Sequence, residues 1–209
     1  MKKKLLSIYA LIFLIYISYN SVALAKTQGN YVGVDFLHTY MKYETNTNNT
    51  YYYGVESADK ESVSINYKYL FNIHDVFFGL GTFADHSNLQ IRDSSGDPWK
   101  LSYRYAGQLM LGYDITNKFA IFATTALTRN KYKIYWPSSK TYRPRANGFG
   151  NSVSYGAGIK YSISDRLDIN FSYERTGFQL IEPDCTVSST CNPGKFNLQI
   201  FKLGLSFNF

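Results

Sequence analysis

A histidine and a serine on the same side of a strand could act as base and nucleophile, and the sequence offers one candidate pair. The histidines are His38, His74 and His86, and only His86 has a serine beside it, in the run His86-Ser87-Asn88. Adjacent side chains of a strand point to opposite faces, whereas side chains two residues apart share one. Geometry must be right before any pKa matters. The sequence therefore predicts no catalytic residues and no enzyme.

A second kind of chemistry, the binding of anions, is indicated by the segment 129–150. It contains six Lys or Arg residues, no Asp or Glu, and several interleaved aromatic residues. Lys and Arg bind phosphate or sulfate, and aromatic rings stack on sugars or contact cations. The candidate ligand-binding residues are Arg129, Lys131, Lys133, Trp136, Lys140, Arg143 and Arg145.

The cysteines, Cys185 and Cys191, lie close together in a polar stretch. In an exported protein such a pair is expected to form a disulfide, which would stiffen the loop that contains it. Two cysteines without a nearby histidine are too few for a zinc site. We therefore expect no metal and no cofactor.

Residues 1–25 have the features of a cleaved signal peptide. Three lysines precede an apolar run, and Ala23-Leu24-Ala25 provides a small-x-small cleavage site. The alternative is a membrane anchor, but the run is shorter than the about 20 residues that a spanning helix needs. Residues 26–209 are then one domain. The formal charge falls from +7 to +4 when three Lys leave with the leader, and such mild basicity does not favour a nucleic-acid partner.

Period-two alternation of apolar and polar residues dominates the remaining sequence. It predicts eight strands, over residues 31–43, 62–71, from 76, 101–113, 119–128, 152–163, 167–175 and 201–209. The aromatic content of 18% agrees with a chain made of strands. Alternation over about 10 residues exceeds the usual soluble strand and matches a tilted membrane strand.

Alternation alone leaves two folds open, a soluble sandwich with the apolar face inward and a membrane barrel with that face outward. Short turns follow the second, fourth and sixth strands, and long polar loops follow the others. Tyr and Phe stand at the strand ends of the apolar face, and the other face is rich in Gly and Ser. These features favour an all-β fold, an eight-stranded antiparallel up-and-down transmembrane β-barrel with short periplasmic turns and long extracellular loops.

The last strand, Lys202-Leu203-Gly204-Leu205-Ser206-Phe207-Asn208-Phe209, carries the most specific motif. The chain resembles the small outer-membrane barrels of the OmpA, OmpX, Opa and NspA kind. In such barrels a similar final strand is the signal read by the barrel-assembly machinery, so the resemblance assigns this role to Lys202, Gly204, Phe207 and Phe209. It also implies the bacterial outer membrane as the location, and outer-membrane lipids and lipopolysaccharide as partners.

The polar face of the predicted barrel supplies a set of charged residues that should lie in the lumen. These are Asp35, Lys68, Arg104, Lys160, Asp168, Glu174 and Lys202. Lys160 and Asp168 are equally far from Ser164 in the sequence, on either side of the predicted turn at that residue. They should therefore face each other across the hairpin. The charges could form a paired polar plug or, as suggested for OmpA-like barrels, a gated ion path. We favour the plug, because the interior of an eight-stranded barrel is filled by side chains.

The loops are therefore the expected site of function. We expect adhesion or another host-surface interaction, or a role in envelope integrity. The basic segment 129–150 would either rest on lipopolysaccharide phosphates or bind sulfated host glycans or an acidic host protein. A narrow porin-like channel for small solutes is the alternative. A lipid A-modifying enzyme comes third. Barrels of this size with that activity use a Ser and a His near the outer rim, and this sequence offers no pair with suitable spacing.

Overall fold

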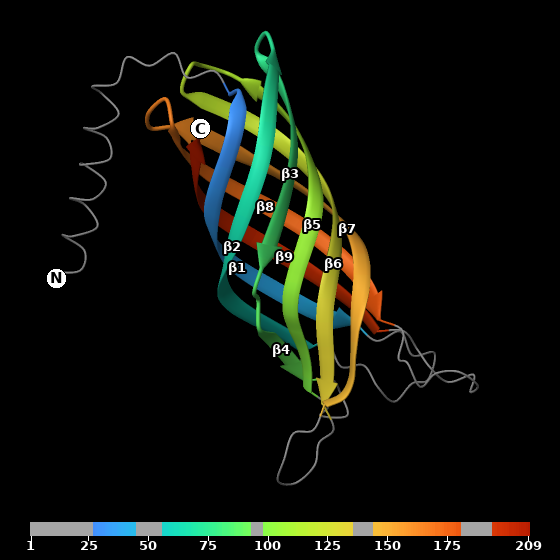
Figure 1. Cartoon of the computed structure of the whole chain (residues 1–209). Helices are drawn as coiled ribbons and strands as arrows, with labels where there is room; N and C mark the ends of the chain where they lie inside the picture. The colour runs from blue at the N-terminus through green and yellow to red at the C-terminus, as the bar shows by residue number, and fades with distance from the viewer. Residues whose placement is uncertain (1–26, 45–55, 93–97, 136–143, 181–193) are drawn as a thin grey trace, which may run out of the picture.

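The computed structural model describes residues 27–44, 56–92, 98–135, 144–180 and 194–209, most of which lie in β-strands (Figure 1). The strands are β1 (Gly29–Glu44), β2 (Glu56–Ile73), β3 (Val76–Asp85), β4 (Leu89–Arg92), β5 (Pro98–Asp114), β6 (Phe119–Tyr135), β7 (Pro144–Ser162), β8 (Leu167–Leu180) and β9 (Gly194–Asn208). All pairings are antiparallel, and each long strand pairs with its neighbours along the chain. Pairing of β1 with β9 closes the sheet, so the predicted eight-stranded barrel is confirmed.

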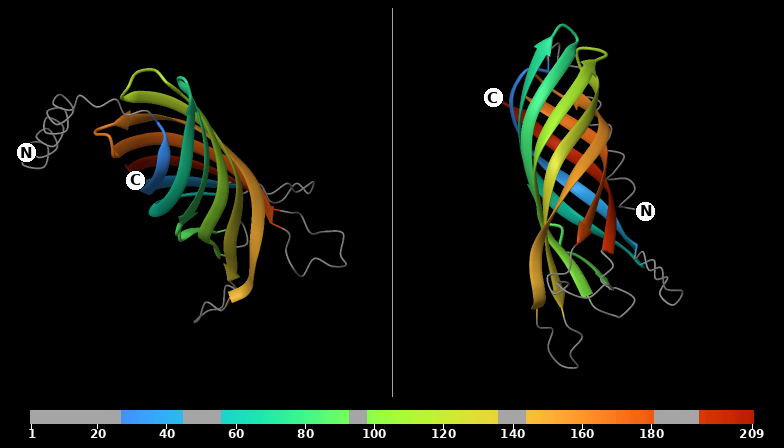
Figure 2. Two further views of the ribbon diagram at one scale, coloured as in Figure 1. Left: turned by 45° about the horizontal axis from the view of Figure 1, so that its top comes forward. Right: turned by 90° about the vertical axis from the view of Figure 1, so that its right-hand side faces the viewer.

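The three short connections all lie at one end of the barrel, which is at the top in Figure 1 and is called here the turn end. The opposite end, called the loop end, is where β1, β3, β5 and β9 begin or finish next to the longer connections. Figure 2 shows that the strands are inclined to the barrel axis. A β-sheet can close into a barrel only if its strands are tilted in this way.

The apolar face of the sheet points outward, as predicted for a membrane barrel. Along β2, Val63, Ile65 and Tyr67 are exposed, whereas Ser64 between them is buried. The same inversion holds around the wall, where most large apolar side chains with high exposure alternate with buried polar ones. In water this arrangement would expose a very large apolar surface, and in a bilayer it places that surface against lipid.

The aromatic residues of β5 give the height of this apolar band. Tyr103 and Tyr113 are both exposed and stand near the two ends of the strand. Ten residues at about 3.4 Å each, inclined by about 40°, span about 26 Å. This agrees with the apolar band of about 25 Å, edged by aromatic residues, that outer-membrane barrels present to the bilayer.

Strict alternation with the exposed Tyr103 and Tyr161 would place Leu101 and Ile163 on the lipid face, but both are buried. Leu101 is only 3% exposed, because a register irregularity between Leu101 and Tyr103 lets Leu101 and Ser102 both face inward. Ile163 lies beyond the end of β7, in the turn to β8, and is also buried. Strict alternation predicts neither position, because it fails at a bulge and at a strand end.

The strands extend further toward the loop end than alternation indicates. The prediction that a loop begins at Arg129 is wrong, since β6 continues to Tyr135 and β7 begins at Pro144. The loop predicted after β3 contains the additional short strand β4, which pairs with β5. Polar residues replace the apolar ones in these extensions, because they start at the outer edge of the apolar band and continue away from the lipid. The alternation of apolar and polar residues therefore fades.

The pairing between β2 and its neighbours is incomplete near the loop end. β3 pairs with β2 only from Ser64 to Ile73, so the segment 56–63 pairs with β1 alone within the described strands. Two hydrogen bonds connect this segment to the chain beyond β3, and Ala58 packs against the apolar cluster that includes Leu89 and Ile91. The His86 N–H donates to the Val63 carbonyl at 3.4 Å, and Lys60 Nζ donates to the Asn88 carbonyl at 3.3 Å.

Some predictions fall on residues outside the described ranges. They include the signal peptide at 1–25 and the disulfide between Cys185 and Cys191. Among the described residues, no helix is both long and apolar enough to cross a membrane.

Candidate functional site

A chain of buried ion pairs crosses the lumen toward the loop end. Arg104 binds Asp85 on one side, with Nη2 at 2.7 Å from Oδ2, and Glu174 on the other, with Nη1 at 3.0 Å from Oε1. Glu174 also forms an ion pair with Lys202. The four residues come from β3, β5, β8 and β9, so the chain connects walls that lie far apart in the sheet. All four are largely buried, and each charge has an opposite partner, as burial requires.

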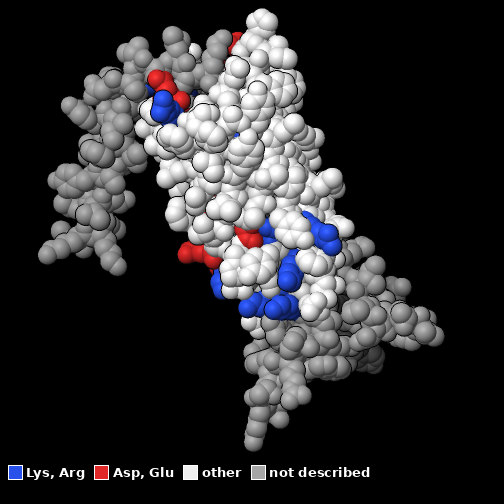
Figure 3. All heavy atoms as spheres, viewed as in Figure 1, with Lys and Arg blue, Asp and Glu red and all other residues white. Residues whose placement is uncertain are grey.

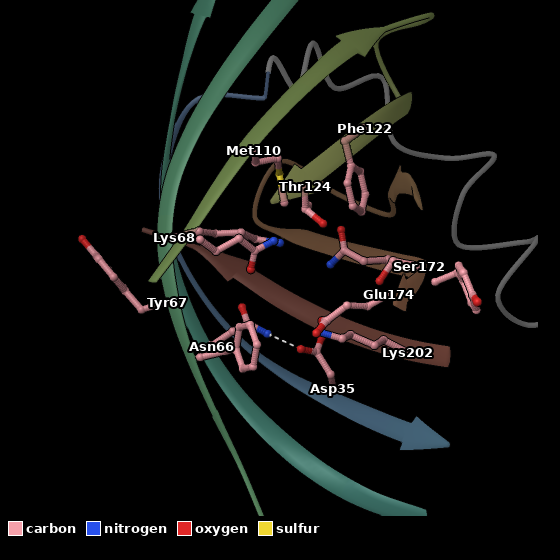
Figure 4. Close-up of a pocket in the computed structure, with 14 residues that line it drawn as sticks. Asp35, Asn66, Tyr67, Lys68, Met110, Phe122, Thr124, Ser172, Glu174 and Lys202 are labelled. Atoms are coloured by element: carbon pink, nitrogen blue, oxygen red, sulfur yellow. Dashed lines mark hydrogen bonds and ion pairs between the residues drawn. The ribbon is translucent and has the colours of Figure 1, made fainter. Parts of the chain in front are cut away.

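A small polar cavity lies beside this chain, as Figure 4 shows. Its volume is about 50 Å³. Asn66 Nδ2 donates a hydrogen bond to Asp35 Oδ2 at 2.8 Å in its wall, and Lys68 lies with Nζ 5.8 Å from the centre of the Tyr31 ring. A polar cavity of this size has room for a few water molecules. It is far smaller than the roughly 300–1,000 Å³ typical of small-molecule sites.

A second polar network lies nearer the turn end. Lys160 Nζ is 3.6 Å from Asp168 Oδ2 and also donates to Thr27 Oγ1, which in turn donates to Asp114 Oδ1 at 2.6 Å. The turn at Ser164 therefore brings Lys160 and Asp168 together. Their pairing is diagonal, because Asp168 lies opposite Ser162 and Lys160 lies opposite Asn170.

Two apolar layers fill the lumen on either side of the charged chain. The layer nearer the turn end consists of Tyr31, Leu70, Phe77, Ala120 and Phe122. The layer nearer the loop end consists of Leu37, Met41, Leu89, Ile91, Leu101, Tyr132, Phe196, Leu198 and Ile200. Together with the ion pairs they pack the interior along its length, as expected for eight strands.

Because of this packing, we expect refolded protein in planar bilayers to show no stable single-channel conductance. A charged solute would have to cross two apolar layers, and transfer of an unpaired ion into such surroundings is very costly. A steady, reproducible unit conductance at neutral pH would contradict the sealed lumen and favour the channel alternative.

The histidine and serine that could have formed a catalytic pair point to opposite sides of the wall. His86 is exposed and stacks on Tyr103 with ring centroids 4.6 Å apart. Ser87 is buried and its Oγ donates to Asp85 Oδ1 at 2.8 Å. The described part of the chain also holds no group of three or more His, Cys, Asp or Glu suited to a metal ion.

The predicted anion-binding residues that the structure describes form a column on the outer face of β6. Arg129, Lys131 and Lys133 alternate with the buried Asn130 and Tyr132 and therefore share the outward face. We call these three residues the β6 cation column. None of them forms an ion pair with a carboxylate among the described residues. Figure 3 shows Lys and Arg gathering near the loop end, beyond a broad band without charge.

The register of the sheet places an aromatic or cationic residue beside each member of the column. Arg129 lies opposite Tyr105, Lys131 opposite Tyr103, and Lys133 opposite Lys100. The column therefore begins at the aromatic edge of the apolar band and continues away from the membrane.

The remaining predicted site residues are placed as follows. Trp136, Lys140 and Arg143 lie outside the described residues, and Arg145 lies on β7 with only its backbone described. The structure puts all seven charged residues predicted for the lumen on the inner face of the barrel. Of the residues assigned to the assembly signal, Phe207 and Phe209 point outward, and Gly204 leaves no room for a Cβ beside Asp35 Oδ1.

Asp85, the partner of Arg104, was not among the predicted lumen residues. Its signal is present in the sequence, since it continues the inward face of β3 two residues after the buried Phe83. The polar run His86-Ser87-Asn88 follows Asp85 directly, so the alternation of apolar and polar residues does not mark the end of β3.

Solved structures with this fold include NspA, a neisserial surface protein, with 15% identity and a TM-score of 0.54 over 87% of this chain and 97% of that chain. Another is Ail of Yersinia pestis in complex with the heparin analogue sucrose octasulfate, with 14% identity and a TM-score of 0.50 over 87% and 99% of the respective chains. At such identity these likenesses establish the fold alone. The curated proteins include no match.

A family described as outer membrane protein beta-barrel domain matches residues 10–209, which is nearly the whole chain. This match agrees with the closed eight-stranded wall, the outward apolar band and its aromatic edges. The chain is therefore a bacterial outer-membrane β-barrel and belongs to the outer membrane protein β-barrel domain family.

Proposed function

We propose that this barrel acts at the cell surface by binding acidic partners through its loop end, in adhesion to a host surface or in support of envelope integrity. Sulfated glycans and acidic surface proteins are the partners whose chemistry fits. The barrel wall holds the binding residues in place, and the packed lumen gives it rigidity.

The observation that carries this proposal is the pair Lys100 and Lys133. The two lysines lie directly opposite each other on β5 and β6, and both point outward. Like charges in directly opposed positions destabilise an antiparallel pair. A bound sulfate or carboxylate would remove this repulsion, so the pair is better explained by an anionic partner than by stability.

The basic residues of the predicted segment extend the same surface. Lys140, Arg143 and Arg145 follow Lys133 in the sequence without an intervening acid, and Trp136 adds an aromatic ring. Polyanionic glycans present sulfates at regular spacing, so several cations are needed to hold them. The solved complex of Ail with a heparin analogue, a fold relative, makes heparin a sensible first probe.

The test is binding of refolded full-length protein to immobilised heparin in detergent. We expect Lys100→Ala/Lys133→Ala to weaken binding about tenfold, the loss of roughly one charge-assisted contact. Alanine at Lys140, Arg143 and Arg145 should weaken it further, and added salt should reduce binding of the wild type.

The matched control is Arg166→Ala, because Arg166 is an exposed cation in a turn at the turn end. It should bind heparin like the wild type. Equal binding by the wild type and by the five-cation variant would remove the proposal, since these five residues are the cations to which it assigns the binding.

A further inference from the structure

The outer wall has an apolar groove of about 620 Å³ in the region that faces lipid. Its floor is made of small residues on β3 and β5, namely Thr82, Ala84 and Gly107. Thr82 and Gly107 lie directly opposite each other, and a Cβ built on Gly107 meets nothing within 4 Å. The centre of the wall is therefore hollowed because three adjacent outward positions carry little or no side chain.

Large side chains form the two sides of this groove. Ile65 and Tyr67 of β2 are strongly exposed on one side. On the other side Leu127 of β6 is 73% exposed, which is the highest value among the large apolar side chains of the described chain. A trough between apolar ridges, two strands wide, is shaped for flexible hydrocarbon chains of lipid.

A cationic cluster lies at the end of the groove nearest the loop end. Arg129 lines the groove itself, and its guanidinium carbon lies 4.4 Å from the centre of the Phe149 ring. Lys131 Nζ lies 5.9 Å from the same ring, and Tyr105 meets Phe149 edge-on at 6.4 Å. Stacking on an aromatic ring fixes a guanidinium while leaving its N–H donors free at the edges, where a phosphate can bind.

We propose that this surface binds the lipid A part of lipopolysaccharide, with a phosphate at Arg129 and Lys131 and an acyl chain in the groove between β2 and β6. The two cations are level with Tyr105 and Tyr103, at the outer aromatic edge of the apolar band, where headgroup phosphates of the outer leaflet lie. Neither cation has a carboxylate partner in the described part of the chain, so both are available to an anion.

A second groove in the wall shows that an apolar hollow alone does not make this site. It has a volume of about 870 Å³ and is lined by residues that include Ala123, Ala157 and Ile159. No Lys or Arg lines it, and it lies nearer the turn end of β5 and β6, beside Val76 and Tyr113. It can accept acyl chains of any lipid, whereas the groove below Arg129 adds selection for a phosphorylated headgroup.

The experiment titrates refolded full-length protein in detergent with bisphosphorylated lipid A and counts bound lipid by native mass spectrometry. Arg129→Ala/Lys131→Ala should weaken binding at least tenfold. Gly107→Leu, whose Cβ would meet no atom within 4 Å, places a larger side chain in the groove and should also weaken binding. Lipid A without phosphates should bind the wild type as poorly as the intact lipid binds the double variant. Inorganic phosphate at millimolar concentration should not compete, because it lacks acyl chains.

Two variants serve as matched controls. Arg175→Ala removes another exposed cation, on β8, and Ala157→Leu fills the groove that lacks a cation. Both should bind phosphorylated lipid A like the wild type. Wild-type affinity in the double variant or in Gly107→Leu, or equal binding of lipid A without phosphates, would overturn the proposal. The heparin experiment uses other cations, so the outcomes of the two tests can be separated.

Discussion

Replacement of Glu174 by alanine is expected to lower the free energy of unfolding of the barrel by about 3–5 kcal/mol, because it leaves two buried cations without their shared anion. Glu174 binds both Arg104 and Lys202 in the lumen. Asp85 would remain as the partner of Arg104, but Lys202 has no other ion pair among the described residues. Urea unfolding of protein refolded in lipid vesicles measures the change.

The control for this prediction restores the charge balance. Glu174→Ala combined with Lys202→Met removes the stranded cation and should recover a large part of the lost stability. Ser172→Ala, on the same face of β8 and beside the same cavity, should cost much less. If Glu174→Ala unfolds at the urea concentration of the wild type, the ion pairs do not stabilise the lumen.

The second large effect is expected from the apolar layer nearer the turn end. Phe77 is fully buried at 0% exposure, and its ring covers Gly112, where a Cβ would lie 2.0 Å from Phe77 Cζ. Phe77→Ala should cost about 3–5 kcal/mol, because the lumen cannot collapse into the space that the ring leaves. Urea unfolding in the same vesicles gives the value.

Phe78 provides the matched control, since it is the next residue and points to the other side of the wall with 37% exposure. Phe78→Ala should cost far less, because lipid chains fill the space and are as apolar as the ring that they replace. Equal costs for the two substitutions would mean that the faces of β3 are not assigned correctly.

The architecture was predictable from the sequence because one physical signal recurs in every strand. In β2, for example, the apolar residues Val63, Ile65 and Tyr67 alternate with the polar residues Ser64 and Asn66. The alternating order of short and long connections then distinguishes a membrane barrel from a soluble sandwich. The inward charges follow from the same alternation, since Arg104 and Glu174 occupy its polar positions.

What the sequence could not give is which charges pair and where strands end. The Glu174 carboxylate lies beside cations on β5 and β9 because the barrel closes with a particular register between its strands. The alternation of apolar and polar residues contains no information about that register. The bulge at Leu101 and the continuation of β6 through Arg129 and Lys133 lie at the outer edge of the apolar band and beyond it, where apolar residues no longer mark the outer face. The cation column was therefore predicted as a loop, although its residue types were recognised.

The incomplete pairing of β2 near the loop end has a consequence for how this protein meets other copies of itself. Along residues 56–62 no described strand pairs with β2 on the side away from β1, and an unpaired edge invites another strand to add to it. Asp59, Lys60 and Glu61 occupy this edge, and charged side chains there make strand addition unfavourable. These charges therefore oppose the addition of a strand from a second barrel at the loop end.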